Sequence, residues 1–253
     1  MKSKLGQNFL INEKVAEREL QYANVNKDDV VLEIGPGEGV LTKLLAERAG
    51  KVLAVEIDEK LVHLLKKFLP GNVELIQGDV LKIDFEKLPC FNKVVSNLPF
   101  QISSPVTFKL LDYGFDLAIL VYQKEFADRL VAKSGCKNYS RLSVNVYYKA
   151  ECEVLEVIPR TCFKPEPKVD SCIVKLTPRE VPPFHVLDEQ FFLDVTKKLF
   201  IHRRKKIKTT LTKLFDIRLD DDIPYMESRV EELSPEEIGR LSNVLYEKIK
   251  KIG

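Results

Sequence analysis

The chain of 253 residues has no tryptophan, only three histidines and only five cysteines. The cysteines form no C-x-x-C pair and their number is odd, so we interpret them as buried free thiols rather than as a disulfide framework or a metal site. The histidines, His63, His185 and His202, lie far apart in the sequence, which argues against a zinc site and against a Ser-His or Cys-His catalytic pair. We therefore expect no metal, and chemistry that runs on other groups.

Long apolar runs are also missing. None approaches the roughly 20 residues that a membrane-spanning helix needs, and the sequence shows no basic-then-apolar leader. Hydrophobic residues make up 45% of the chain, which is enough for a real core. We expect a cytoplasmic protein that has no membrane partner and acts as a monomer.

Acidic residues are absent from one basic segment, Val195 to Phe215, which has eight cations, although the net charge of the chain is only +2. A solvated helix face would carry acids four residues from its bases, and none occur within the segment. We therefore predict that the segment contacts a polyanion and that its central residues, Arg203, Arg204, Lys205 and Lys206, bind the phosphates of this polyanion.

Glycines interrupt the apolar run of residues 30–42 and indicate a buried strand that turns into a helix. Gly35, Gly37 and Gly39 allow close approach to a ligand, and the helix that follows points free N–H groups at the same place. Val40 stands where the dinucleotide fingerprint G-x-G-x-x-G requires its last glycine, which weakens a NAD or FAD interpretation.

Carboxylates accompany three consecutive predicted strands. Glu33 lies before the glycine turn, Glu56 ends the next strand, and Asp79 follows the third. The carboxyl ends of parallel strands meet at one edge of a sheet, where open α/β folds bind ligands. Glu56 suits a ribose diol, Asp79 an amino group on a base, and Glu33 a cationic ligand.

Predicted strands and helices alternate along the first part of the chain. The strands lie near 30–34, 51–57, 72–77, 92–97 and 116–122, and the helices near 39–49, 59–69, 103–112 and 124–133. This repetition predicts an α/β fold with a mostly parallel sheet. Strands at 142–157 and 169–177 then predict an antiparallel hairpin. Prolines at 178, 182 and 183 mark a domain boundary, and helical patterns at 188–200, 203–215 and 234–250 follow. We expect domains at 1–180 and 181–253.

The segment Asn97-Leu98-Pro99-Phe100 directly follows the fourth predicted strand. The side-chain oxygen of Asn97 and the carbonyl of Leu98 are two acceptors that can grip both hydrogens of an aromatic amine, and Pro99 fixes the backbone between them and Phe100. Phe100 supplies a flat surface for stacking the ring that carries this amine. These four residues are the predicted catalytic segment, and Phe163 is predicted to cover the opposite face of the ring.

These motifs together resemble the ribosomal RNA adenine N6-dimethyltransferases of the KsgA type, within the S-adenosylmethionine-dependent methyltransferases. The resemblance covers essentially the whole chain. It runs through Leu5-Gly6-Gln7-Asn8-Phe9-Leu10, Glu33 to Thr42, Glu56, Gly78-Asp79, Asn97 to Phe100, Gln123-Lys124-Glu125, the segment Phe163 to Ser171 with its Pro165 and Pro167, and a predicted Arg203-Arg204-Lys205 helix.

The resemblance implies a Rossmann-like, seven-stranded sheet with one antiparallel strand, followed by a small helical RNA-binding domain. It also implies the cofactor S-adenosylmethionine and the dimethylation of two adjacent adenosines in a hairpin loop of small-subunit (16S) rRNA during ribosome biogenesis. The resemblance implies a cofactor site lined by Asn8, Leu10, Gly35, Glu56, Asp79 and Asn97, and we also predict Gln7, Glu33 and Gly37 as cofactor-site residues. One departure is Phe100, where the family more often has tyrosine, so the resemblance supports stacking by this ring and implies no hydroxyl at this position.

Other functions are compatible with the same residues. A large-subunit (23S) rRNA adenine methyltransferase of the antibiotic-resistance type would share the motifs and differ in its RNA. DNA adenine and protein glutamine methyltransferases also grip planar amines, but we see no separate target-recognition domain. A ribosome assembly factor that acts mainly by binding is a further alternative.

Overall fold

The computed structural model describes residues 8–214 and 222–250, and the chain divides into two compact units. The first unit comprises the chain up to Ala127 together with Ala150–Pro178, and the second comprises Asp128–Lys149 and the chain from Arg179 onward. The division differs from the predicted domains, 1–180 and 181–253, because Asp128–Lys149 belongs to the second unit. Tyr139, Val144 and Tyr148 of this insertion are buried in the second unit's apolar core, which explains the difference.

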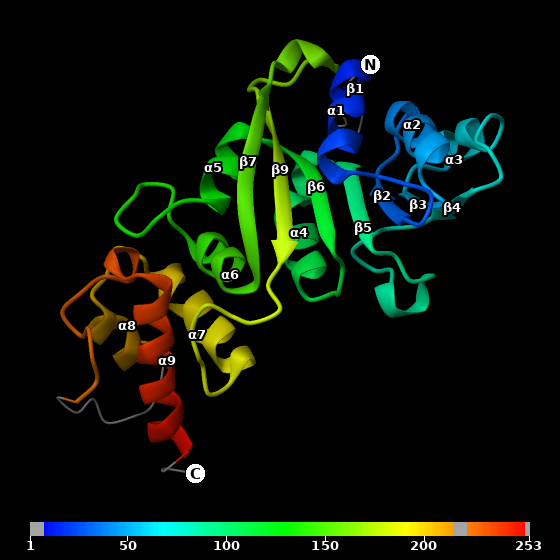
Figure 1. Cartoon of the computed structure of the whole chain (residues 1–253). Coiled ribbons are helices and arrows are strands. Elements are labelled where there is room, and N and C mark those ends of the chain that lie inside the picture. The colour runs from blue at the N-terminus through cyan, green and yellow to red at the C-terminus, as the bar shows by residue number, and fades with distance from the viewer. Residues whose placement is uncertain (1–7, 215–221, 251–253) are drawn as a thin grey trace. The chain divides into compact units, whose positions relative to one another are not determined.

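A seven-stranded sheet forms the centre of the first unit (Figure 1). Its order is β4 (Val73–Gln77), β3 (Lys51–Glu56), β2 (Val30–Ile34), β5 (Lys93–Asn97), β6 (Leu117–Gln123), β9 (Ser171–Pro178) and β7 (Ala150–Ile158). Neighbouring strands are parallel except for β9, which runs antiparallel to both β6 and β7. The predicted α/β fold with one antiparallel strand is confirmed, and that strand lies one position inside the edge.

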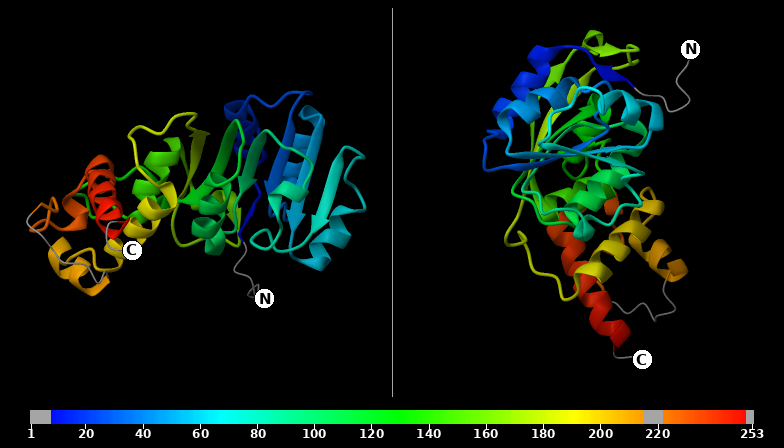
Figure 2. Two further views of the ribbon diagram at one scale, coloured as in Figure 1. Left: turned by 90° about the horizontal axis from the view of Figure 1, so that it is seen from below. Right: turned by 90° about the vertical axis from the view of Figure 1, so that its right-hand side faces the viewer.

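Helices cover both faces of this sheet (Figure 2), because its central strands are apolar at nearly every position. On one face, α1 (Glu13–Ala23) and α2 (Val40–Arg48) share a core with alternate residues of the strands. On the other face, the Thr107 hydroxyl of α4 (Ser103–Leu111) lies 2.7 Å from the hydroxyl of Tyr122 on β6. The chain also forms α3 (Glu59–Leu65) and α5 (Lys124–Leu130) close to their predicted positions.

The predicted strand at 142–157 is wrong in its first half. Residues Arg141–Lys149 form the helix α6, and β7 begins only at Ala150. Apolar residues at 142, 144, 146 and 148 alternate with polar ones, which indicates a strand. In the structure the polar residues Ser143 and Asn145 are buried as well, so α6 is covered on more than one side. The alternation of apolar and polar residues therefore does not mark a buried and an exposed face, and it cannot distinguish a strand from a helix here.

A second, two-stranded sheet ties down the start of the described chain. In it, β1 (Phe9–Leu10) pairs antiparallel with β8 (Phe163–Lys164). Phe9 and Leu10 thus fold back onto the chain near Phe163. Leu10 is 6% exposed and belongs to the core shared by α1 and α2.

The second unit is helical, with α6, α7 (Glu189–Ile201), α8 (Ile207–Leu214) and α9 (Pro235–Lys250) around one apolar core. Ser234 caps α9: its hydroxyl accepts from the Glu237 N–H at 3.3 Å, and the Glu237 carboxylate accepts from the Ser234 N–H at 2.8 Å. The helix predicted at 203–215 begins only at Ile207, so residues 203–205 lie in the turn before it.

All five cysteines are free thiols, as predicted. Cys162 and Cys172 are buried, but Cys90 and Cys136 are exposed, so the prediction of burial is wrong for these two. Both lie in connecting loops rather than in the core elements. The described part of the chain contains no helix long and apolar enough to cross a membrane. Nor do the described side chains include a cluster of three His, Cys, Asp or Glu residues that could hold a metal ion.

Candidate active site

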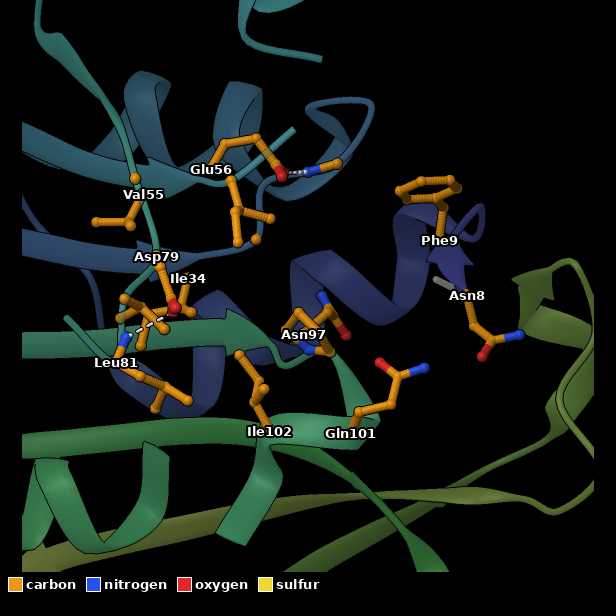
Figure 3. Close-up of a pocket in the computed structure, with 16 residues that line it drawn as sticks. Asn8, Phe9, Ile34, Val55, Glu56, Asp79, Leu81, Asn97, Gln101 and Ile102 are labelled. Atoms are coloured by element: carbon orange, nitrogen blue, oxygen red, sulfur yellow. Dashed lines mark hydrogen bonds between the residues drawn. The ribbon is translucent and has the colours of Figure 1, made fainter. Parts of the chain in front are cut away.

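The predicted ligand site is a pocket at the carboxyl ends of β2, β3, β4 and β5 (Figure 3). Residues from the glycine turn, the strand-end acids and the catalytic segment line it together, including Gly35, Gly37, Glu56, Asp79, Asn97 and Pro99. A smaller adjoining pocket shares several of these residues and adds Leu10, Glu33 and Glu38. Of the predicted cofactor-site residues, all that the structure describes line one of the two pockets, and Gln7 lies outside the described residues.

The glycine turn needs its glycines for backbone conformation and for space. Gly35, Gly37 and Gly39 have φ of 73°, 58° and 84°, a region that other residues rarely adopt. A Cβ atom on Gly37 would lie 2.6 Å from the ring of Phe9, and one on Gly35 would lie 3.1 Å from the Pro99 side chain. The turn is therefore packed between β1 and the catalytic segment.

Glu56 fixes the same turn from the end of β3. Its carboxylate accepts from the backbone N–H of Asp58 at 2.9 Å and from that of Gly37 at 3.3 Å. Burial raises the pKa of Glu56, and these backbone hydrogen bonds oppose the rise by stabilising the ionised form. A ligand that donates to Glu56 is therefore also held against the glycine turn.

Asp79 also lines the pocket, and one of its oxygens accepts from the Leu81 N–H at 3.0 Å. Apolar side chains flank the two acids: Ile57 follows Glu56, and Val80 follows Asp79. Ile57 is 52% exposed, so a flat ligand could cover it. Sequence reasoning missed both, although each is the apolar residue directly after a strand-end carboxylate.

Asn97 is the last residue of β5, and the nitrogen and oxygen of its side-chain amide have different surroundings. The amide nitrogen donates to the carboxyl of Glu19 on α1, at 3.2 Å and 3.4 Å from its two oxygens. The amide oxygen is buried and accepts no hydrogen bond among the described residues. Ser96 holds this strand end against β2, because its hydroxyl donates to the Ile34 carbonyl at 2.7 Å and accepts from the Ile34 N–H.

Glu19 is a site residue that sequence reasoning missed. It lies on the apolar face of α1 between Ala16 and Leu20 and is 0% exposed. A glutamate rarely occupies such a position without a partner, which is the signal that could have found it. Burial raises its pKa to about 8, and the hydrogen bond from Asn97 opposes that rise.

Glu33, predicted to meet a cationic ligand, is 2% exposed and lines the smaller pocket. One of its carboxyl oxygens has no hydrogen-bond partner among the described residues. Burial raises the pKa of Glu33 to about 8, and the nearby charge of Glu56 adds to the rise. An unpartnered buried carboxyl is costly, and a cation in the pocket would offset that cost.

The catalytic segment leaves β5 with Leu98 buried at 2% exposure and Phe100 partly exposed. The rings of Phe100 and Phe163 meet edge to face, with centroids 6.2 Å apart. Phe163 is only 3% exposed and belongs to the core, so in this structure it supports Phe100 rather than presenting an open ring face. Its predicted contact with the target base stays a prediction.

Two of the four predicted phosphate-binding residues form ion pairs with acidic side chains, and among the described residues the other two do not. Arg203 forms an ion pair with Glu231 at 2.7 Å, and Lys206 forms one with Glu227 at 2.6 Å. The acids missing from the basic segment are thus supplied by a later part of the chain. Arg204 and Lys205 are exposed, and within the described ranges no acidic side chain lies within ion-pair distance of them.

Comparison with known proteins gives a family. The model of the ribosomal RNA adenine dimethylase family matches residues 1–247. A protein of Thermococcus onnurineus named a probable ribosomal RNA small subunit methyltransferase A is 48% identical over 256 residues, covering 96% of this chain and 92% of the relative.

Two solved structures resemble the chain over nearly its whole length. A dimethyladenosine transferase from Plasmodium falciparum has a TM-score of 0.79 at 28% identity and covers 96% of this chain and 98% of its own. The 23S rRNA methyltransferase ErmE has a TM-score of 0.70 at 30% identity and covers 93% of this chain and 98% of its own. The chain therefore belongs to the ribosomal RNA adenine dimethylase family, which confirms the predicted class of S-adenosylmethionine-dependent rRNA methyltransferase.

Proposed function

We propose that this protein dimethylates the N6 amines of two adjacent adenosines in a hairpin loop of small-subunit rRNA. The observation that carries the proposal is the Asn97 amide oxygen, which is buried and has no hydrogen-bond partner among the described residues, in a residue that lines the ligand pocket. A buried acceptor with no partner is costly unless a donor arrives with the ligand. The amine of adenine is such a donor.

Asn97 and the Leu98 carbonyl together can accept both hydrogens of this amine. The lone pair of the amine is delocalised into the ring, which makes the nitrogen a weak nucleophile. Two acceptors that hold the hydrogens draw the lone pair out of conjugation and stabilise the positive charge that develops on nitrogen during attack. No general base is then needed before attack.

The pocket fits S-adenosylmethionine, which supplies an activated methyl group when bound. Glu56 would accept from the ribose diol, Asp79 from the base amine, and Glu33 would face a cationic group, while Gly35 and Gly37 permit close approach. The remaining requirement is to hold the target nitrogen about 3 Å from the methyl carbon in line with the leaving group, which is a task of positioning. Phe100 supports it by stacking on the flipped base.

The second unit would hold the RNA, with Arg204 and Lys205 as its phosphate contacts. The N-terminal chain with β1 and the sheet would form the catalytic domain. Five free thiols suit a reducing compartment, so we place the protein in the cytoplasm, acting as a monomer on a pre-ribosomal particle.

The small-subunit target is supported by the relative at 48% identity, whose name specifies that subunit. The alternative, methylation of large-subunit rRNA, is not favoured by this name, although the similarity to ErmE also spans nearly the whole chain. Mass-spectrometric mapping of dimethyladenosine after treatment of small-subunit particles and of protein-free large-subunit rRNA separates the two. Dimethylation of two adjacent adenosines in the small-subunit particles alone is the expected result, and modification of the large-subunit RNA alone would overturn the proposal.

A further inference from the structure

The contact between Glu19 and Asn97 determines how the catalytic amide is oriented. Both carboxyl oxygens of Glu19 lie near the amide nitrogen of Asn97, at 3.2 Å and 3.4 Å. The amide oxygen accepts no hydrogen bond within the described chain. A carboxylate accepts hydrogen bonds and does not donate them, so it selects the nitrogen side of an amide.

The amide of an asparagine can be turned by half a rotation so that its oxygen and nitrogen exchange places. In the reversed orientation the Asn97 oxygen would face the Glu19 oxygens, and two acceptors would repel one another. The Asn97 nitrogen would then present its hydrogens to the target amine, which needs an acceptor. Only the observed orientation supports the proposed chemistry.

We propose that Glu19 is a positioning residue whose ionised carboxylate fixes the Asn97 amide with its oxygen available to the target amine. The expected effect of Glu19 on turnover rests on the proposed function, whereas its effect on the orientation of the Asn97 amide does not. Glu19 touches neither the ligand nor the target base in this scheme and acts through Asn97.

The surroundings of Glu19 place its ionisation in a useful pH range. Burial raises its pKa to about 8, the hydrogen bond from Asn97 opposes the rise, and the charge of Glu33 on β2 adds to it. On its own helix Arg18 lowers the pKa, and Glu156 on β7 raises it again. Arg18 and Glu156 form an ion pair at 2.6 Å, so their effects on Glu19 largely cancel.

Protonation of Glu19 removes its preference for one orientation of the Asn97 amide. A neutral Glu19 has one O–H that can donate to the reversed Asn97 oxygen, so both orientations of the amide become allowed. The fraction of protein with a correctly oriented amide therefore rises as the pH increases through the pKa of Glu19. Turnover should rise over the same range.

The test is Glu19→Gln, with Glu17→Gln on the exposed side of the same helix as the matched control. Glutamine keeps the size of the side chain but can pair with either orientation of Asn97. We expect single-turnover rates at saturating ligands to fall about twofold at pH 8.5, because two equally allowed orientations leave about half of the protein with the productive one. The rise of the rate with pH should be lost, and cofactor affinity should stay unchanged. In an Asn97→Ala background, Glu19→Gln should cause no further loss.

A second readout does not depend on turnover. The side-chain amide resonances of Asn97, assigned by their absence in Asn97→Ala, should titrate with pH in the wild type and in Glu17→Gln but not in Glu19→Gln. A wild-type protein that methylates no RNA would refute the proposed function and leave this readout intact. Equal pH profiles in wild type and Glu19→Gln, or equal titration of the Asn97 resonances, would overturn the positioning role.

Discussion

Replacing Glu33 by glutamine should make the protein more stable at alkaline pH. Glu33 is 2% exposed and one of its oxygens has no partner among the described residues. Burial raises its pKa from 4.5 to about 8, so the folded protein keeps a proton that the unfolded chain releases. The free energy of unfolding therefore falls as the pH rises from about 4.5 to about 8, the window set by the two pKa values.

The size of the effect follows from the two pKa values. At about 1.4 kcal/mol for each pH unit between them, ionising Glu33 in a rigid site would cost about 5 kcal/mol above pH 8. Water entry and small movements reduce such costs, so we expect Glu33→Gln to be about 2–5 kcal/mol more stable than the wild type at pH 9. At pH 4, where Glu33 is protonated in the folded protein and largely so in the unfolded chain, the two proteins should differ little.

Urea denaturation at pH 4, 6, 7.5 and 9 measures this difference, with Glu47→Gln on the exposed face of α2 as the control. The control should follow the wild type at every pH. Parallel curves for wild type and Glu33→Gln would show that the Glu33 carboxyl is already ionised and stabilised, which would refute the reasoning from burial. A cation in the pocket should narrow the difference, because it stabilises the charge.

Further predictions concern the ligand and the RNA. Glu56→Ala should weaken S-adenosylmethionine binding by about 1–3 kcal/mol in a calorimetric titration, because it strands the ribose donors; unchanged affinity would contradict this assignment. Asn97→Ala should leave RNA binding intact and lower the single-turnover rate by about 10²–10³, the cost of losing one preorganised partner of developing charge, and a fully active variant would place the chemistry elsewhere. Phe100→Ala should cost about 1–3 kcal/mol in holding the flipped base, whereas Phe100→Tyr keeps the ring and should remain active. Neutralising Arg204 and Lys205 should weaken the salt dependence of RNA binding, so that the slope of log affinity against log salt concentration falls by about 0.7–0.9 for each lost contact. An unchanged slope would show that the two residues do not contact phosphates.

The sequence determined the α/β fold and the location of the site. The buried strands of the first unit are apolar, so local patterns predicted β2 at its observed bounds. Because the carboxyl ends of parallel strands meet at one edge, the order of motifs alone brought Gly35, Glu56 and Asn97 together.

Other features depended on contacts between distant parts of the chain. The alternating residues of α6 indicated a strand, and only its packing on several sides made it a helix. The acidic partners of Arg203 and Lys206 come from residues more than 20 positions later, so no local charge pattern could divide the basic segment into paired and unpaired cations.

The amide of Asn97 shows most clearly what the sequence predicts and what only the folded structure decides. Its residue type and its place after a strand were enough to predict that it grips an amine. The direction of its oxygen depends on Glu19, which lies 78 positions earlier in the chain and meets it only in the folded protein. The sequence by itself thus determined which groups carry the chemistry, and the tertiary structure decided how they are oriented and ionised, because orientation and pKa depend on neighbours that folding brings from remote positions.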